Sequence, residues 1–558
     1  METWLQNYNP LGHWLPSAIV AAIPLLFLFY LLAVRRTFAP LAAAYAAGAA
    51  ILIAVVVVGM PPHLAVISFV YGGAFGLLPI AWVVFAAIFV YQVSLESGQF
   101  EVVKASITNL TADRRLQALL IAFAFGSIME GAAGFGAPVA ICAALMVGVG
   151  FKPFQAAILC LMANTSPVAW GAVGVPVITL AGVTGLPLND LSAMCARILM
   201  ITSLFVPLWM IRLMVGWKET LEVMPAAVVC GVSFAVATFF WGNYVDPYLI
   251  NIASGSFCLL VTGIFLRFWK PRTTWRFDDE KGTEASRVHY TAGQVFRGWL
   301  PFLILGVFVM AWGWPSVKTS LDRFEMGAFN GTYNLAVPML HQAIVRTPPV
   351  VAQATPQAAV YGFNWLSTTG TGVFIAGVFA CLLAGFSPAR AYATFLRTCK
   401  FMKVPAMAIF CMLGLGYVIR YSGLDAILGL AFTRTGYFYP AFATVLGWIG
   451  VMITGSDASA NALFGSLQRI TAEKLGLDPV LMAAANTTGG VAGKMIAFQS
   501  IVVATTATKS TGNEAQILRY IVWHSLALVF IIAMIVMAYQ YIFPQFIPHN
   551  IQFLAPMF

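Results

Sequence analysis

Residues 15–34 read LPSAIVAAIPLLFLFYLLAV and contain no charged side chain. Residues 525–543, SLALVFIIAMIVMAYQYIF, form a second run without Asp, Glu, Lys or Arg. An apolar helix of about 20 residues crosses the roughly 30 Å hydrocarbon core of a bilayer. A barrel strand would instead alternate apolar and polar residues at short period. These two runs therefore predict membrane-spanning helices.

The composition extends that prediction to the whole chain. Hydrophobic residues make up 60% of its 558 residues and charged residues 9%, whereas a soluble domain is roughly a quarter charged. In lipid, backbone polar groups must be satisfied within the element, as they are in a helix. We expect an all-α polytopic membrane protein of about 12 to 14 transmembrane helices, some re-entrant or broken.

Lysine and arginine residues predict the orientation, because they gather in cytoplasmic loops. Arg35-Arg36 follow the first span, residues 267–297 hold seven Lys and Arg residues, and residues 241–247 hold none. The N-terminus is therefore expected outside. The polar stretch 269–296 is expected to be a central cytoplasmic loop between a first half, 1–268, and a second half, 297–558. The net charge of +10 fits these loops, and no soluble basic face predicts nucleic-acid binding.

Short motifs recur in the same order in the two halves. They predict two repeats, about 60–215 and about 345–540, which we expect to be inverted, as is usual in secondary transporters. The matched pairs are 60–62 (MPP) with 347–349 (TPP), Tyr71-Gly72 with Tyr361-Gly362, 130–133 (EGAA) with 457–460 (DASA), 150–153 (GFKP) with 476–479 (GLDP), and 163–166 (ANTS) with 485–488 (ANTT).

Polar residues at membrane depth, flanked by Gly and Pro, mark the candidate site. Breaks in helices are tolerated only against protein or a wet cavity, and the N-termini of half-helices can hold an anion. We expect broken elements near 130–176 and 455–500 to meet near the bilayer midplane. The predicted substrate-binding residues are Asn164, Thr165, Ser166, Ser459, Asn461, Asn486, Thr487, Thr488, Lys494 and Gln499. For each polar side chain the alternative is a hydrogen bond that joins two helices.

Ionisable residues at depth are costly and suggest function. Glu130 and Asp457 are the candidates for proton coupling, and Lys494 is the candidate cation for an anionic substrate. The alternative for Lys494 is a structural ion pair with Asp457. Arg420 is expected at the membrane interface, because Ser422, Gly423 and Asp425 follow it.

Motifs for catalysis or ATP binding are absent from the sequence. It contains no His-Glu-x-x-His, no Gly-x-Ser-x-Gly and no P-loop motif. Its eight cysteines form no Cys-x-x-Cys pair. We therefore expect no enzyme activity, no metal site and no cofactor; the oligomeric state is left open.

The chain resembles the bacterial L-lactate permease family nearly from end to end. The resemblance rests on 130–141 (EGAAGFGAPVAI), 290–295 (YTAGQV), 421–424 (YSGL), 455–464 (GSDASANALF) and 484–496 (AANTTGGVAGKMI). It implies a symporter in the bacterial inner membrane that imports L-lactate and related 2-hydroxymonocarboxylates, such as glycolate, with protons. Members usually have Ser-Pro-Gln-Ser where this chain has Ala497-Phe498-Gln499-Ser500, a difference that bears on substrate choice. A sodium-coupled or other small-carboxylate carrier on the same fold remains the alternative among transporters. Outside the transporters, the alternative hypothesis is a channel or a membrane enzyme.

Overall fold

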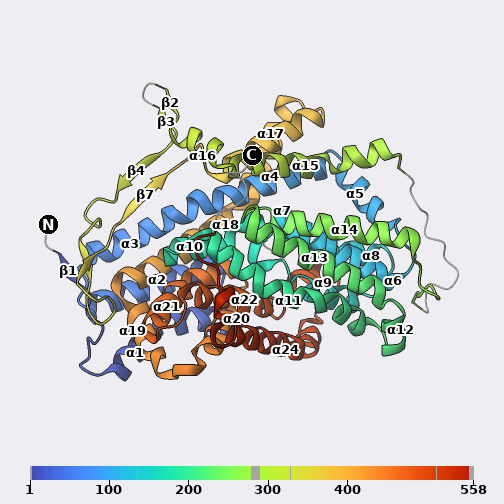
Figure 1. Cartoon of the computed structure of the whole chain (residues 1–558). Coiled ribbons are helices and arrows are strands. Elements are labelled where there is room, and N and C mark those ends of the chain that lie inside the picture. Colours follow the sequence, from blue (N-terminus) through green and yellow to red (C-terminus); the bar gives the residue numbers. More distant parts are fainter. Residues whose placement is uncertain (1–2, 135, 278–289, 327–328, 511, 552–558) are drawn as a thin grey trace.

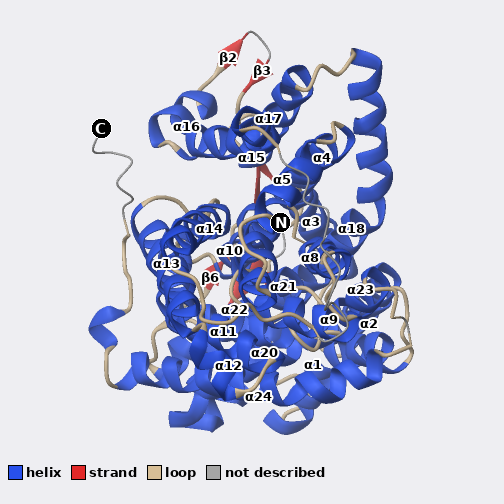
Figure 2. Ribbon diagram, turned by 90° about the vertical axis from the view of Figure 1, so that its right-hand side faces the viewer, coloured by secondary structure: helices blue, strands red, loops and turns tan. Residues whose placement is uncertain are grey.

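The computed structural model describes residues 3–134, 136–277, 290–326, 329–510 and 512–551. Within them, 12 helices are long and apolar enough to cross a membrane, or 13 if one bent pair counts as a span. Figure 2 shows a molecule built almost entirely of helices, with a few short strands. The prediction of an all-α polytopic protein with broken helices is confirmed. The repeat arrangement stays a prediction.

Most of the helices follow one another along the chain with short connections, and residues 323–368 form a longer connection that carries strands (Figure 1). Those of the first half are α1 (Trp14–Phe29), α2 (Ala39–Val56), α3 (Pro62–Phe75), α4 (Trp82–Glu96), α5 (Gln99–Thr108), α6 (Arg114–Ala118), α7 (Gly126–Ala132), α8 (Ala137–Gly148), α9 (Pro153–Ala163), α10 (Gly171–Thr184), α11 (Leu188–Met214), α12 (Trp217–Glu222), α13 (Met224–Tyr244) and α14 (Ile250–Phe268). Those of the second half are α15 (Ala292–Gly313), α16 (Pro315–Asp322), α17 (Thr369–Leu383), α18 (Pro388–Ser422), α19 (Leu424–Phe432), α20 (Tyr439–Thr454), α21 (Asp457–Leu475), α22 (Pro479–Lys494), α23 (Phe498–Ala507) and α24 (Glu514–Tyr541). Wider π-helical turns cover Tyr30–Val34, Gly76–Ala81 and Leu119–Phe125, and short 3-10 turns cover Val168–Trp170, Thr433–Phe438 and Pro544–Phe546.

Short strands gather at the end of the molecule that carries the N-terminus, at the left of Figure 1. They are β1 (Trp4–Leu5), β2 (Glu325–Met326), β3 (Phe329–Asn330), β4 (Tyr333–Ala336), β5 (Ile344–Arg346), β6 (Thr355–Pro356) and β7 (Val360–Phe363). Strand β1 pairs in parallel with β5, which pairs antiparallel with β6, and β4 pairs antiparallel with β7. The polar segment 323–363 is thus tied to the N-terminal segment, and both lie on the side that the positive residues predict to be external.

The opposite end holds the predicted cytoplasmic loop. Arg115 is fully buried there, and it pairs with Asp113 at 2.7 Å and with Glu222 at 3.1 Å. Its Nη2 also donates to the carbonyl of Thr273 at 2.9 Å, and the Trp275 backbone N–H donates to Asp113. These bonds hold the start of the predicted loop 269–296 against α6 and α12. Residues 278–289 of that loop lie outside the described residues.

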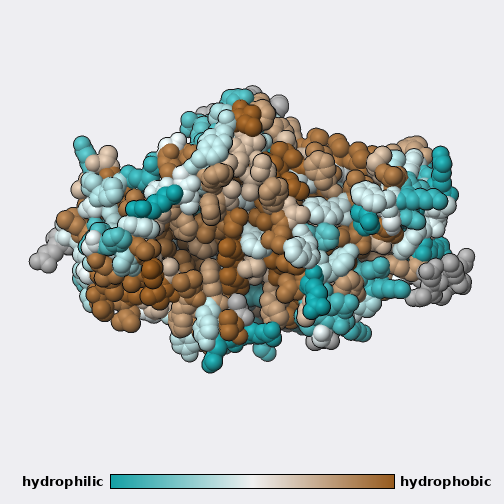
Figure 3. Space-filling view, turned by 90° about the horizontal axis from the view of Figure 1, so that it is seen from below, coloured by the Kyte–Doolittle hydropathy of each residue, from teal (hydrophilic) through white to brown (hydrophobic). Residues whose placement is uncertain are grey.

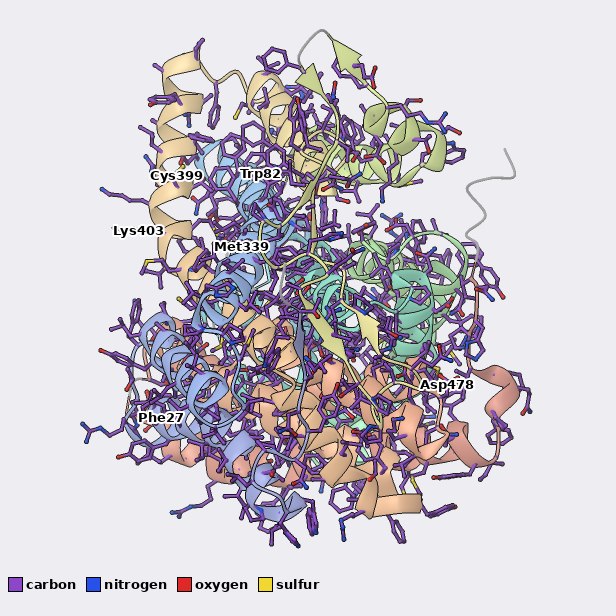
Figure 4. The ribbon with its side chains drawn as sticks, turned by 90° about the vertical axis from the view of Figure 1, so that its left-hand side faces the viewer. Phe27, Trp82, Met339, Cys399, Lys403 and Asp478 are labelled. Atoms are coloured by element: carbon purple, nitrogen blue, oxygen red, sulfur yellow. The ribbon has the colours of Figure 1, made fainter. Side chains whose placement is uncertain are left out.

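The surface has the pattern expected of a protein in a bilayer. Hydrophobic residues cover much of the face in Figure 3, and hydrophilic residues gather toward its right-hand end. The N-terminal half of α18 carries both hydrophobic and hydrophilic residues at the edge of the molecule, where Cys399 and Lys403 point outward (Figure 4).

Glycines allow α20 and α22 to pack with their backbones in contact. A Cβ on Gly447 would lie 1.8 Å from the carbonyl oxygen of Asn486, and a Cβ on Gly489 would lie 2.0 Å from that of Thr444. Gly489 and Gly490 lie within residues 455–500, where the sequence predicts a broken element, but the helix does not break at these two glycines. Helix α22 is continuous from Pro479 to Lys494, because the glycines serve close helix packing rather than a turn.

We therefore expect Gly489→Ala to destabilise the protein. The added methyl group has no space at 2.0 Å from a backbone oxygen, and overpacking of this kind costs about 1–3 kcal/mol. The measurement is thermal unfolding of the purified protein in detergent. Gly148→Ala is the matched control, because a Cβ there meets nothing within 4 Å. Equal melting temperatures for the two variants would contradict this account of α20 and α22.

Candidate functional site

A cavity of about 120 Å³ lies where several helices break. This volume has room for several water molecules or a small metabolite. The polar side chains that line it are those of Glu130, Ser456, Asp457, Lys494, Gln499 and Ser500. The remaining lining residues are Gly136, Val168, Gly171, Val175, Pro176, Gly455, Ala458 and Val503.

Four helices begin at this cavity. Helix α8 starts after Gly136, α21 starts at Asp457, and α23 starts just before Gln499. Helix α10 begins at Gly171, but residues 172–174 have positive φ, so its regular turns start at Val175, which also lines the cavity. Gly136 and Gly455 have φ of +85° and +71°, which only glycine adopts readily. Helices α9 and α10 form a bent pair at 68°. The N-terminal ends of helices carry unpaired N–H groups and partial positive charge, so these four ends favour an anion in the cavity.

Glu130 contributes one carboxyl group from α7. Its side chain is buried, and Oε2 has no hydrogen-bond partner among the described residues. A Cβ on Gly171 would lie 2.4 Å from Oε1. The absence of a side chain at Gly171 therefore allows the carboxyl group to lie directly against the start of α10.

Asp457 contributes the second carboxyl group from the first turn of α21. Both of its oxygens are buried, and neither has a hydrogen-bond partner among the described residues. A Cβ on Gly490 of α22 would lie 2.5 Å from Oδ1. Buried polar groups in native proteins are nearly always satisfied, so an unpartnered carboxyl group on a cavity wall indicates a group that meets a proton, water or ligand.

Lys494 ends α22 and supplies the cation of the cavity. Its Nζ donates a hydrogen bond of 2.6 Å to the carbonyl of Gly455. Among the described residues, no carboxylate oxygen lies within 4.0 Å of Nζ, so Lys494 forms no direct ion pair with them. Both Glu130 and Asp457 still interact with it electrostatically. Lys494 is therefore shared between two carboxyl groups rather than locked to Asp457, the alternative considered from the sequence.

Three predicted binding residues instead join helices behind the cavity. Asn461 donates to the carbonyl of Pro176 at 3.0 Å, while its Oδ1 accepts from Asn486 and from Thr487, both at 2.9 Å. Gln468 donates to Asn486 at 3.1 Å and accepts from Tyr439 at 2.7 Å. All of these side chains have 0% exposure. They connect α20, α21 and α22 to the middle of α10.

The other predicted residues lie around the cavity without lining it. Thr165 and Thr488 donate to backbone carbonyls one turn earlier, at 2.7 and 2.9 Å. The side chain of Asn164 interacts with the Glu130 carboxyl group, and the hydroxyl of Ser166 is buried without a hydrogen-bond partner among the described residues. The backbone N–H of Ser459 donates to the hydroxyl of Ser456, which caps α21. Only Lys494 and Gln499 of the ten predicted binding residues line the cavity, together with Glu130 and Asp457. Ser456 and Ser500 also line it, and the signal for them is their position next to Asp457 and Gln499.

A bundle of broken helices around a buried cavity with a lysine and two carboxyl groups defines a membrane transporter. The family model for L-lactate permease matches residues 17–543, and the chain belongs to this family. It is 42% identical to the L-lactate permease of Bacillus subtilis over 98% of this chain and 100% of that protein. It is 43% identical to the glycolate permease GlcA of Escherichia coli over 97% of this chain and 99% of that protein.

A solved structure, that of the YdaH transporter of Alcanivorax borkumensis, overlaps 84% of this chain and 86% of its own with a TM-score of 0.42 and 14% identity. The family and the 12 candidate spans identify a multi-pass protein of the bacterial inner membrane, as predicted. In the part of the chain that the structure describes, no group of three or more His, Cys, Asp or Glu residues is placed to hold a metal ion.

Proposed function

We propose that this chain imports L-lactate and related 2-hydroxymonocarboxylates, such as glycolate, together with protons. The observation that carries the proposal is the cavity at the helix breaks, where Lys494 faces the carboxyl groups of Glu130 and Asp457. Oε2 of Glu130 and both carboxyl oxygens of Asp457 are buried without a hydrogen-bond partner among the described residues. The similarity to an L-lactate permease and to a glycolate permease supports the substrate class.

The charges in the cavity favour coupling between the anion and a proton. With both carboxyl groups ionised and Lys494 protonated, the polar lining carries a net charge of −1. Binding of one proton makes the lining neutral. Binding of a monocarboxylate then returns the net charge of the cavity to −1, and a second proton would neutralise it again. Net charge in a low-dielectric cavity is costly, so each bound anion favours the uptake of one proton. The expected stoichiometry is one proton per lactate.

The positions of the residues divide their roles. Lys494 and the N-terminal ends of α21 and α23 supply the positive field for the carboxylate, and Gln499 supplies an amide that can both donate and accept. Glu130 and Asp457 hold the exchanging protons. Asn461, Asn486 and Thr487 form the hydrogen-bonded network that fixes α10, α21 and α22 around the site.

The test is uptake of labelled L-lactate into proteoliposomes that contain the purified chain. An inward proton gradient in sodium-free buffer should produce accumulation above the external concentration, and a proton uncoupler should abolish it. Because one proton and one anion carry no net charge, a membrane potential alone should not drive accumulation. Unlabelled glycolate and D-lactate should compete, and acetate should compete less. Uptake that needs sodium would favour the sodium-coupled carrier, and equilibration without accumulation would indicate a channel.

A further inference from the structure

A second, larger cavity of about 800 Å³ lies on the side that carries the strands. We call it the tyrosine vestibule, because Tyr71, Tyr361, Tyr417 and Tyr421 line it. Its walls come from α3, α10, α16, α18, β4 and β7. Tyr71 and Tyr361, the matched residues of the two proposed repeats, meet here edge to face with ring centroids 6.5 Å apart. The transport site described above uses none of these residues.

Arg420 brings a cation with spare donors into the tyrosine vestibule. Its Nη1 donates to the carbonyl of Gly182 at 3.3 Å, and its guanidinium lies 6.0 Å from the ring of Tyr417 and 5.8 Å from that of Tyr421. Its Nε is buried without a hydrogen-bond partner among the described residues. Arginine has five N–H donors, so most of its capacity for an anion is free.

A neighbouring hydroxyl offers another donor. Tyr71, Tyr361 and Tyr421 each donate to a backbone carbonyl, of Val360, Ala74 and Ala358 respectively. The hydroxyl of Tyr417 has no such bond among the described side chains, although the residue is only 3% exposed. Tyr417 and Arg420 lie one turn apart on α18. Together they present the donor set that a carboxylate requires.

The charge of the lining fits a monoanion. Arg420 and Lys318 are the cations that line the tyrosine vestibule, and Asp322 is the single carboxylate. Asp322 already accepts hydrogen bonds from Thr332 and Ser367. The lining therefore carries a net charge of +1. Behind it, Arg346 and the buried Asp425 interact electrostatically and offset each other, so the charge that faces a ligand is that of the lining.

One helix joins the two cavities. Pro176 of α10 lines the central cavity, and Gly182 of the same helix lines the tyrosine vestibule. Six residues of helix span about 9 Å at 1.5 Å per residue. The anion donors of Arg420 therefore lie about two helical turns from the central site, toward the side predicted to be external.

We propose that the tyrosine vestibule is a second binding site for a small monocarboxylate, held by Arg420 and Tyr417, and that it receives the anion before the central cavity does. This inference rests on the proposed function for the identity of the ligand. It makes Arg420 a binding residue rather than only a link between α18 and α10.

The experiment measures binding without transport. The full chain carrying Lys494→Ala, which lacks the central cation, is purified in detergent and equilibrated with labelled L-lactate. We expect about one bound lactate per chain. Adding Arg420→Gln should weaken this binding at least tenfold, whereas adding Arg434→Gln should leave it unchanged. Arg434 is the matched control, because it is exposed and lies 3.8 Å from the ring of Trp14 at the N-terminal start of α1. Melting temperatures show whether each variant is folded.

Tyr417→Phe in the same background provides an independent variant if Arg420→Gln fails to fold. It removes only the hydroxyl and should weaken binding about fivefold, with ring contacts retained. Binding that is unaffected by Arg420→Gln, or no binding to the Lys494→Ala protein, would overturn the proposal. Displacement of the labelled L-lactate by glycerol phosphate at a lower concentration than by unlabelled L-lactate would assign the site to a lipid headgroup and also overturn the proposal. Failure of the proposed function itself would appear separately, as wild-type proteoliposomes that do not accumulate L-lactate.

Discussion

Lys494→Ala is expected to reduce L-lactate uptake by at least two orders of magnitude. Lys494 is the only cation that lines the described central cavity, and its ammonium is held at 2.6 Å by the carbonyl of Gly455. Removing one member of a buried charged set costs about 3–5 kcal/mol, and 1.4 kcal/mol is a factor of ten. Lys494→Arg should retain a small fraction of the activity, because a planar guanidinium differs in shape and reach from an ammonium. Initial rates in proteoliposomes measure both effects.

The structural alternative for Lys494 has its own control. If Lys494 served only to neutralise Asp457, then Lys494→Ala together with Asp457→Ala would recover transport, because the unpaired carboxylate would be gone. We expect this double variant to remain inactive. Recovery of uptake would show that the substrate finds its positive charge elsewhere. Lys318→Ala tests whether loss of any cavity cation has this effect, since that lysine is exposed in the tyrosine vestibule.

Glu130→Gln is expected to abolish proton-driven accumulation while leaving exchange of labelled for unlabelled lactate largely intact. The amide keeps the size and polarity of the side chain but cannot bind and release a proton. The accumulation ratio under an inward proton gradient should fall to about one, because the anion then crosses without its proton. Asp457→Asn is expected to show the same separation of accumulation from exchange.

Two comparisons make the Glu130 result specific. Glu101→Gln removes a carboxylate that is 66% exposed and paired with Lys104 at 2.6 Å, so it should accumulate lactate like the wild type. Normal accumulation in both Glu130→Gln and Asp457→Asn would exclude these groups as the coupling site. If a variant loses lactate exchange to the same extent as lactate accumulation, the defect lies in folding or in substrate binding instead. The melting temperature of the variant would distinguish a folding defect from a binding defect.

The pattern of apolar residues within single segments was sufficient to predict the class of fold. The runs at 15–34 and 525–543 are long, apolar and uncharged, and a bilayer leaves such segments one option, the helix. Breaks near residues 130–176 and 455–500 could be foreseen as well, because Gly and Pro interrupt helices wherever they occur in dense groups. Glu130, Asp457 and Lys494 were identifiable because ionisable side chains are rare at membrane depth.

Which polar residues face the cavity depended on contacts between distant segments. Asn486 and Thr487 resemble binding residues in the sequence, yet their side chains bond to Asn461, about 25 residues away. Gly489 and Gly490 resemble a helix break, yet the approach of Thr444 and Asp457 makes them packing residues. Arg420 gave no sign of a cavity, because Tyr71 and Tyr361 reach it from segments far away in the chain. The sequence by itself determined a helical membrane carrier with buried charges, since burial in lipid restricts each segment separately. Tertiary structure alone decided which polar groups are used up in helix packing and which remain free for a ligand, because a hydrogen bond depends on the partner that folding places opposite each group.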